Sequence, residues 1–594
     1  MTSSTGEREN RQRSIMSAVL LVLLAAASSG DVAVAQRALV APEAATGWTE
    51  KPLARAQRHM VAAAHPIAAE VGREILRRGG NALDAAIATV LVLGIVEPQS
   101  SGLGGGAFML VHDAASRTLS TYDARETAPS AAQPDRFLRE EKPIGFRVAV
   151  NSGLSVGVPG LVRGLELAHA EHGRLSWADL FAPAIRIARD GFPLSPRLHG
   201  LLVRNGAERF SAKARAHFFD ATGRAHAIGH VLKNPELAAT LERIAQEGAG
   251  AFYTGPVADA IVNAVREASP AGDLKLSDLS AYRALTRDPV CINYRRRRVC
   301  GMGAPSSGGL TVAQTLKLIE PFAQVQGPDK RMSVPALHII AEAEKLAYAD
   351  RDFYIADPAF VDVPAGYLDD TYLAQRRSLI DTERAMEKAL PGTPPGARAD
   401  FNGADATRER GGTTHLSVVD SEGNAVAMTA TIEGAFGSGL WAAGFLLNNE
   451  LTDFSWRPVD VQGRKIVNRV EAGKRPRSSM APTIVYGEDR NVEAVLGAPG
   501  GHRIIVYVVK ALVGLIDWGM DAQAVAALPN FGDRGRGFEI ERGRGAAVAA
   551  LRLQVLGHKV RTDAMTSGLH IIVQHGGYLE GGADPRREGV ALGD

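Results

Sequence analysis

Two alternating segments joined by a short turn constrain this chain more than any other stretch. In residues 413–420 (TTHLSVVD) and 424–432 (NAVAMTATI), side-chain character alternates with the two-residue period typical of strands. Residues 421–424 (SEGN) favour a tight turn between them. The pair predicts a β-hairpin in which Thr431 lies within one residue of the position opposite Thr413. Alternation places both threonines on one face. Two hydroxyl groups are therefore predicted to meet at the open end of the hairpin.

The segment before the hairpin has the composition of a linker. Residues 391–412 (PGTPPGARADFNGADATRERGG) are rich in Pro, Gly and Ala and contain few large apolar side chains. A break in organisation is therefore predicted immediately before Thr413. A strand does not need the two glycines that end this segment, so they raise the question of another purpose.

Nucleophilic chemistry gives that junction a purpose. A threonine hydroxyl needs a base beside it, and no His or Lys stands nearby in an obvious dyad. If the chain is cut before Thr413, the freed α-amine, with a pKa near ~7.7–8.0, can serve as that base. Gly412 would offer an unhindered carbonyl and a backbone able to adopt a strained conformation. The plain alternative is that Thr413 merely begins a strand after a Gly-Gly loop.

The region upstream reads as helix, helix, glycine loop and strand. Pro66 suits the first turn of a helix that should end at Gly79-Gly80, and an apolar helix follows before the loop GLGGG at residues 102–106. A dinucleotide-binding loop follows a strand and opens a helix, whereas this loop does the reverse. Residues 161–284 and 341–354 also have helical patterns.

Composition excludes several classes of partner. The chain has 594 residues, 22% charged and 45% hydrophobic residues, and a formal net charge of +2. No field is strong enough to indicate binding to nucleic acid or to an anionic membrane. The run RRRR at residues 295–298 is better explained as a solvated hairpin turn.

The N-terminus has the pattern of a secretion signal. Three arginines precede the apolar run IMSAVLLVLLAAA, and small residues at positions 33 and 35 precede Gln36. Residues 1–35 are therefore predicted to be a signal peptide, and the mature protein to be exported to the periplasm or secreted. The run is too short to span a bilayer, although an uncleaved leader could still act as an anchor.

Two cysteines, Cys291 and Cys300, flank the sequence INYRRRRV. The spacing suggests a hairpin in which they face each other, so in an oxidising compartment one local disulfide is expected. Metal ligation is the weaker alternative.

Many ordered motifs from about residue 64 to the C-terminus resemble the γ-glutamyltranspeptidase family of N-terminal nucleophile hydrolases. They are SGLGGGAFMLV, DARETAP, APSSGG, AEAEKLAYADRD, GGTTHLSVVDSEGNAVAMTATIEGAFGSGL, LLNNELTDF, KRPRSSMAPTIV, GAPGGHRI and GADPRREG. The resemblance implies a four-layer αββα sandwich of mixed α/β class, one compact unit cleaved into a large chain, 36–412, and a small chain, 413–594.

The resemblance also implies roles for individual residues. Self-cleavage would fall between Gly412 and Thr413, Thr413 would be the nucleophile, and Thr431 would hydrogen-bond it. Gly500 and Gly501 match the backbone groups that hold the oxyanion. The remaining matched positions would bind substrate: Arg125, Ser478 and Ser479 the α-carboxylate, and Glu433, Glu450 and Asp453 the α-ammonium.

Glu433 departs from the family pattern, because many members have asparagine there. It adds a third acidic group to the ammonium site. Residues 455–474 correspond to the lid region over the pocket and match the family poorly.

The implied reaction is cleavage of a γ-glutamyl amide such as glutathione, with transfer of the glutamyl group to water or an amino acid. No metal or organic cofactor is implied, and no dense His/Cys cluster is present. Two rival hypotheses are kept. One is an acylase of the same architecture that removes a glutaryl side chain from a β-lactam; the other is an exported binding protein that is never cleaved.

Overall fold

The structure is a computed structural model that describes residues 45–398, 402–403, 405, 407, 411–543 and 545–594. The signal peptide predicted over residues 1–35 lies outside these ranges, as do Arg408 to Arg410 of the linker. Residues 43–594 form one compact unit. No helix among the described residues is long and apolar enough to cross a membrane.

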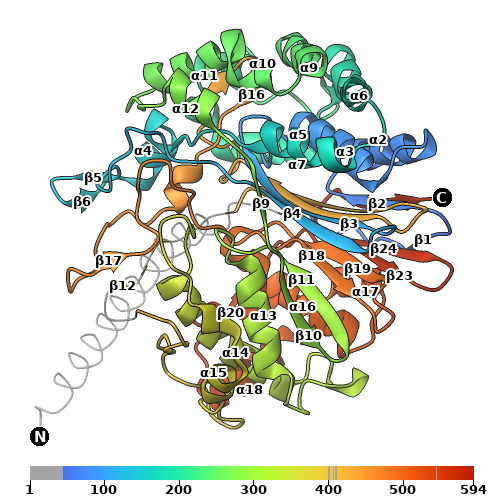
Figure 1. Cartoon of the computed structure of the whole chain (residues 1–594), viewed down its shortest axis with the longest axis vertical. Helices are drawn as coiled ribbons and strands as arrows, with labels where there is room; N and C mark the ends of the chain where they lie inside the picture. The colour runs from blue at the N-terminus through green and yellow to red at the C-terminus, as the bar shows by residue number, and fades with distance from the viewer. Residues whose placement is uncertain (1–44, 399–401, 404, 406, 408–410, 544) are drawn as a thin grey trace, which may run out of the picture. The chain divides into compact units, whose positions relative to one another are not determined.

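Two seven-stranded antiparallel sheets form the centre of this unit. The upper sheet of Figure 1 has the order β25-β2-β13-β14-β3-β4-β9 and the lower sheet the order β1-β24-β23-β19-β18-β11-β10. The upper strands are β25 (Val590–Gly593), β2 (Met60–Ala63), β13 (Thr413–Val419), β14 (Ala425–Thr431), β3 (Gly106–Asp113), β4 (Thr118–Ala124) and β9 (Leu285–Arg287). The lower strands are β1 (Ala54–Ala56), β24 (Leu579–Ala583), β23 (His570–Gln574), β19 (Val492–Gly497), β18 (Thr483–Tyr486), β11 (Arg297–Gly301) and β10 (Val290–Tyr294).

Helices cover the outer face of each sheet, which gives the four layers αββα (Figure 1). The upper layer includes α2 (Pro66–Arg77), α3 (Ala82–Val96) and α5 (Leu161–His172). The lower layer includes α13 (Gly308–Ile319), α14 (Val334–Tyr354), α16 (Ile504–Ile516) and α17 (Ala522–Ala527). The predicted sandwich is confirmed.

Both faces of each sheet are buried, so the strands alternate between two cores. Leu416 and Val418 point toward the upper helices and belong to one hydrophobic cluster. Phe108 and Ala427 belong to a second cluster that fills the space between the sheets and reaches the lower helices. Thr413 and the other residues of its face point into the space between the sheets, where polar groups must find partners.

Local signals place several elements where the sequence predicts them. α2 begins at Pro66 with His65 as its N-cap, and Gly79 just beyond its end has a φ of +91°. The apolar α3 is buried almost throughout, and β3 follows the glycine loop. Strands β13 and β14 form the predicted hairpin, with Gly423 at a φ of +88° in the turn.

Cys291 and Cys300 lie directly opposite each other in the β10–β11 hairpin and are joined by a disulfide bond. In the linker, β12 (Asn402–Gly403) pairs in parallel with β17 (Lys465–Ile466), which lies in the segment 455–474 where a lid is expected.

Candidate active site

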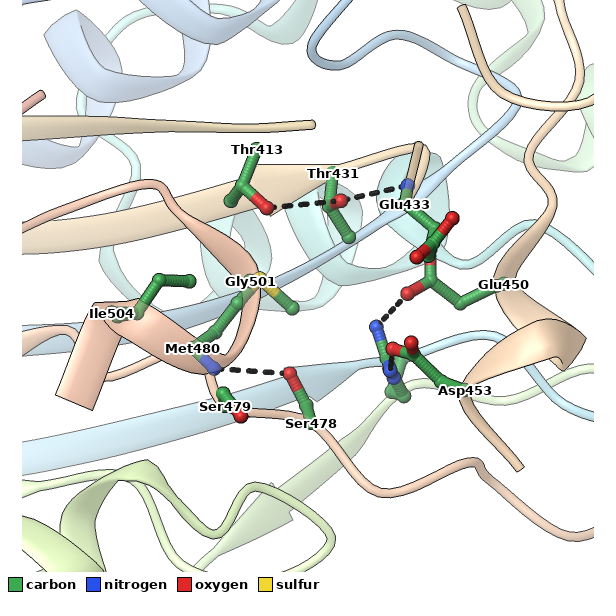
Figure 2. Close-up of a pocket in the computed structure, with 11 residues that line it drawn as sticks. Thr413, Thr431, Glu433, Glu450, Asp453, Ser478, Ser479, Met480, Gly501 and Ile504 are labelled. Carbon is green, nitrogen blue, oxygen red and sulfur yellow. Dashed lines mark hydrogen bonds and ion pairs between the residues drawn. The ribbon is translucent and has the colours of Figure 1, made fainter. Parts of the chain in front are cut away.

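A pocket opens at the end of the β13–β14 hairpin. Figure 2 shows its lining, which is made of Arg125, Thr413, Thr431, Glu433, Glu450, Asp453, Ser478, Ser479, Met480, Gly501 and Ile504. Nine of the ten residues to which the sequence analysis assigned catalysis or substrate binding therefore meet in one place; Gly500 is adjacent to the lining.

The two threonines are paired directly across the hairpin. Thr413 is the register partner of Thr431, and the Thr413 hydroxyl donates to Thr431 Oγ1 over 3.3 Å. The same Thr431 oxygen accepts the backbone N–H of Glu433 at 2.8 Å (Figure 2). Both hydroxyl groups are buried, and Thr431 is held in place from two sides.

Steric crowding requires glycine at both positions before Thr413. A Cβ at Gly411 would lie 2.9 Å from the carbonyl carbon of Gly500 and 3.0 Å from the nitrogen of Gly501. A Cβ at Gly412 would collide with the carbonyl oxygen of Glu433. Neither glycine has a positive φ. Close approach to neighbouring backbone is therefore a further reason for glycine at both positions.

Gly500 and Gly501 form a turn that begins η7 (Gly501–Arg503) and leads into α16. Their φ values of +141° and +56° are in the range that favours glycine. A Cβ at Gly500 would also lie 2.8 Å from the ring of Tyr507. This turn lies against Gly411, one residue before the Gly412–Thr413 bond.

The Arg125 guanidinium is buried and already bound to protein acceptors. Nη1 is ion-paired with Glu450, and Nη2 lies 2.6 Å from Asp453 Oδ2. Nε donates to the carbonyl of Pro476 at 3.1 Å, and Nη2 donates to the carbonyl of Arg477 at 3.0 Å. Four of its five N–H groups thus have acceptors within the protein. Burial opposes the charge, yet these two carboxylates raise the pKa of Arg125 above its ordinary value.

Carboxyl groups outnumber this single guanidinium. Burial raises the pKa of Glu450 well above its ordinary value; Arg125 opposes this shift, and the charges of Glu126 and Glu433 add to it. Burial also raises the pKa of Glu126 to about 7, although its carboxylate lies 4.0 Å from Arg125 Nη1. Burial therefore disfavours the charged form of the carboxyl groups beside Arg125, and a cation entering the pocket can offset that penalty.

Glu433, the residue that departs from the family pattern, is held by its neighbours. Its carboxylate accepts a hydrogen bond from the Asn449 amide, and its φ is +72°. The side-chain oxygen of Asn449, Oδ1, accepts a hydrogen bond from the backbone N–H of Gly434 at 2.9 Å. Asn449 therefore fixes both the side chain and the backbone at this edge of the pocket.

The serine pair lies on the other side of the pocket (Figure 2). Ser478 Oγ accepts the backbone N–H of Met480 at 3.1 Å. Ser479 Oγ accepts from Nη2 of Arg351 at 2.7 Å.

Several residues of this site were not singled out from the sequence. Glu126 directly follows Arg125 in the DARETAP motif, so its acidic type and position were an available signal. Met480 and Ile504 supply apolar lining, and Asn449 and Arg351 act through other residues; their spacing alone gave no sign of these contacts.

One group of potential metal ligands exists within the described ranges, formed by His338, Glu342 and His558. Most of its potential ligand atoms make hydrogen bonds, and His558 Nδ1 makes none with the described residues. Nδ1 of His338 lies 2.7 Å from Nε2 of His558, and Nε2 of His338 lies 2.7 Å from the backbone carbonyl oxygen of Asp381. Lys345 donates to Glu342 at 2.7 Å. With a lysine ammonium in the place of a cation, the group does not suit a metal, and it shares no residue with the pocket.

Comparisons with known proteins agree with this geometry. The sequence model described as Gamma-glutamyltranspeptidase matches residues 68–594. The chain is 37% identical to the glutathione hydrolase proenzyme of Escherichia coli over 579 residues, covering 95% of this chain and 97% of that protein. It is 36% identical to the glutathione hydrolase proenzyme of Bacillus subtilis over 547 residues, covering 90% and 91%.

The solved structure of a cephalosporin acylase from Bacillus halodurans is also similar. Its TM-score is 0.80 at 27% identity, covering 92% of this chain and 97% of that one. The family match, the identities over nearly the whole chain and the assembled pocket agree: the chain belongs to the γ-glutamyltranspeptidase family of enzymes.

Proposed function

We propose that this chain is the precursor of a self-cleaving γ-glutamyl hydrolase and transferase that acts on glutathione and related γ-glutamyl amides. The observation that carries the proposal is the Thr413 hydroxyl, which is paired with Thr431 in a pocket lined by acidic groups and a guanidinium. The names of the two bacterial relatives support the choice of substrate.

The first reaction is cleavage of the chain itself. The Thr413 oxygen adds to the carbonyl carbon of Gly412, the C–N bond breaks, and a proton moves to the nitrogen, which becomes a free α-amine. Water then hydrolyses the resulting ester and restores the hydroxyl. The close contact of Gly411 with the Gly500–Gly501 turn supports this, because backbone N–H groups next to the scissile bond can stabilise the developing oxyanion.

The second reaction uses the amine that the first one creates. The α-amine of Thr413 takes the hydroxyl proton, the oxygen attacks the γ-carbonyl of the substrate, and the same proton passes to the leaving amine. Water or an amino acid then removes the glutamyl group from the threonyl ester. The hydrogen bond between the two threonine hydroxyls supports Thr431 as the residue that orients the nucleophile.

The charged lining accounts for recognition of the glutamyl group. Glu433, Glu450 and Asp453 would hold the α-ammonium, and Arg125 with the serine pair Ser478 and Ser479 would hold the α-carboxylate. The buried carboxyl groups favour a substrate that brings a cation.

The two products are proposed to be a large subunit, residues 36–412, and a small subunit, residues 413–594, that remain together as a heterodimer. Export is also proposed, to the periplasm or the medium, because the leader pattern at residues 1–35 precedes the family match that begins at residue 68. The mature enzyme would then meet glutathione outside the cytoplasm.

The runner-up is a glutaryl-type acylase, supported by the likeness to the cephalosporin acylase. A glutaryl group brings a carboxylate and no ammonium into an acidic pocket, so we expect its turnover to be poorer. Loss of one charged hydrogen-bonding partner in a desolvated site costs about 1.5–3 kcal/mol, so γ-glutamyl anilide should exceed glutaryl anilide at least about tenfold in kcat/KM. Equal or better turnover of the glutaryl compound would favour the acylase.

Replacement of the nucleophile tests the whole proposal. Purified wild-type protein should run as two chains on a denaturing gel, with the small chain beginning at Thr413, and should release the anilide from its γ-glutamyl conjugate. Thr413→Ala should remain one chain without this activity. A Thr413→Ala protein that still splits at the same bond would mean that an outside protease makes the cut. A wild-type chain that stays whole would instead support the uncleaved binding protein.

A further inference from the structure

A second arginine lies behind the serine pair of the pocket. Arg351 belongs to α14 and its side chain has no exposed surface. Nη2 donates to Ser479 Oγ at 2.7 Å, Nε donates to Ser307 Oγ at 2.7 Å, and Nη1 lies 2.6 Å from Asp352 Oδ1. The three nitrogens of one planar group thus bind three different residues.

These contacts determine how the serine hydroxyls are oriented. A guanidinium can only donate, so Ser479 Oγ must accept from Arg351, and its own hydrogen is directed away from that guanidinium. Ser478 Oγ likewise accepts from the backbone of Met480. Both serines line the pocket, so an anion entering it would compete for their hydroxyl hydrogens.

Arg351 also fixes the backbone that carries the pair. The Ser307 hydroxyl accepts from Arg351 and donates to the carbonyl of Ser478 at 2.6 Å. The N–H of Ser307 donates to the same carbonyl at 2.7 Å, and the N–H of Ser478 donates to the carbonyl of Pro305 at 3.0 Å. The position of Ser478 is therefore determined by a turn that Arg351 holds.

The guanidinium of Arg125 lines the pocket but is already bound to protein carboxylates. Arg125 is already engaged by Glu450 and Asp453, so a substrate carboxylate must compete with both. The charge of Arg351 reaches the same side of the pocket through the Ser479 hydroxyl.

We propose that Arg351 is a positioning residue for the substrate's α-carboxylate: it holds Ser478 and Ser479 as hydrogen-bond donors and polarises the Ser479 hydroxyl. The inference rests on the proposed function and deepens it. It gives a purpose to two sequence motifs that the pocket lining leaves unexplained, APSSGG at residues 304–309 and AEAEKLAYADRD at residues 341–352. It also means that the proposed large subunit completes a binding surface carried by the small one.

Two inhibitors that differ in charge separate this role from a purely structural one. Glutarate would place a carboxylate at the serine pair and has no ammonium, whereas 4-aminobutyrate has the ammonium and lacks that carboxylate. Arg351→Lys keeps a positive charge but cannot span three partners. We expect the inhibition constant of glutarate and the KM of γ-glutamyl anilide to rise about tenfold, the worth of one charge-assisted hydrogen bond, with kcat nearly unchanged.

The inhibition constant of 4-aminobutyrate should stay within about twofold of its wild-type value, because that ligand makes no contact that depends on Arg351. Equal weakening of both inhibitors would overturn the proposal and assign Arg351 to folding alone. Arg376→Lys is the matched control. It removes another buried arginine, which pairs with Asp350 at 3.0 Å and binds the carbonyls of Leu346 and Leu390, and should leave the ratio of the two constants unchanged.

A double-mutant cycle keeps the test decisive if one variant is unstable. In a Ser479→Ala background, Arg351→Lys should weaken glutarate binding less than it does in the wild type, because the hydrogen bond to Ser479 is already lost and only the hold on Ser478 through Ser307 remains. Additive effects would overturn the proposal. Failure of the proposed function looks different, since wild-type protein would then be inactive on γ-glutamyl anilide whatever stands at position 351.

Discussion

At the scale of single residues, the pocket is organised before any substrate enters. Arg125 holds Glu450 and Asp453, which lie more than 300 residues away in the sequence, and thereby keeps like charges close together. Crowded carboxyl groups in a desolvated site resist ionisation, and the raised pKa values of Glu126 and Glu450 reflect this. Such a site prefers a ligand that carries an ammonium.

The pKa of Glu126, raised to about 7 by burial, predicts a particular pH dependence. As the pH falls through 7, Glu126 gains a proton, the pocket loses negative charge and the substrate ammonium binds less well. The α-amine of Thr413 must also be unprotonated, so log kcat/KM against pH should rise with a limiting slope of about two below both pKa values. In Glu126→Gln one ionisation is removed, and the slope should fall to about one.

Thermal unfolding supplies the control for that variant. A carboxyl group whose folded pKa exceeds its unfolded value of about 4.3 destabilises the fold progressively as the pH rises from about 4.3 to about 7, and the cost stays constant above that. Glu126→Gln should therefore raise Tm more at pH 8 than at pH 5. If the slope of log kcat/KM against pH does not change but Tm follows this pattern, Glu126 does not contribute to substrate binding. Its burial would then still destabilise the fold when it is charged.

At the scale of elements, the junction between linker and hairpin joins three loops. Gly411 passes against the Gly500–Gly501 turn, and Gly412 passes against Glu433 and Gly434, which follow β14. The absence of side chains lets the scissile bond approach both, so the Gly-Gly sequence serves packing at the cleavage site.

Gly411→Ala should therefore slow self-cleavage. The added methyl would lie 2.9–3.0 Å from backbone atoms of Gly500 and Gly501, and these must shift. Displacement of reacting groups by a fraction of an ångström to 1 Å can reduce the rate by about tenfold to a hundredfold. The measurement is the decay of the full-length band during expression and after purification.

Gly576→Ala is the matched control for this prediction. Gly576 has no atom within 4 Å of its added Cβ and no positive φ, so that variant should mature at the wild-type rate. Equal rates for Gly411→Ala and the control would mean that the approach to the glycine turn does not limit cleavage.

At the scale of the whole molecule, the two proposed subunits share both sheets. We call a pairing between a strand from residues before 413 and a strand from residue 413 onward a seam. The seams are β25–β2, β2–β13 and β14–β3 in one sheet and β1–β24 and β11–β18 in the other. Each pairing is an antiparallel hydrogen-bonded ladder, and the strands of the β2–β13 and β14–β3 seams are buried. Neither part retains a complete sheet alone.

The cleaved protein should therefore remain one particle. In native buffer the two chains should elute together from a sizing column at the position of uncleaved Thr413→Ala, and should separate only in denaturant, as expected for an obligate interface with the character of a divided core. Elution of a free small chain under native conditions would contradict the interleaved arrangement.

Local patterns determined a large part of this architecture. Alternation and the SEGN turn were sufficient to bring Thr413 opposite Thr431, because hairpin register depends on neighbours within twenty residues. The same holds for the start of α2 at Pro66 and for the facing cysteines, Cys291 and Cys300. The family motifs then identified most of the residues that line the pocket.

Only the tertiary structure decided what those residues do to one another. The resemblance to the family implied that Arg125 binds the substrate's α-carboxylate, but only folding places Arg125 between Glu450 and Asp453. The crowding of Gly412 by Glu433 and the contact of Arg351 with Ser479 also had no local sign in the sequence. Periodicity and turn chemistry act between residues close in sequence, but burial, charge pairing and steric approach depend on segments that only folding brings together.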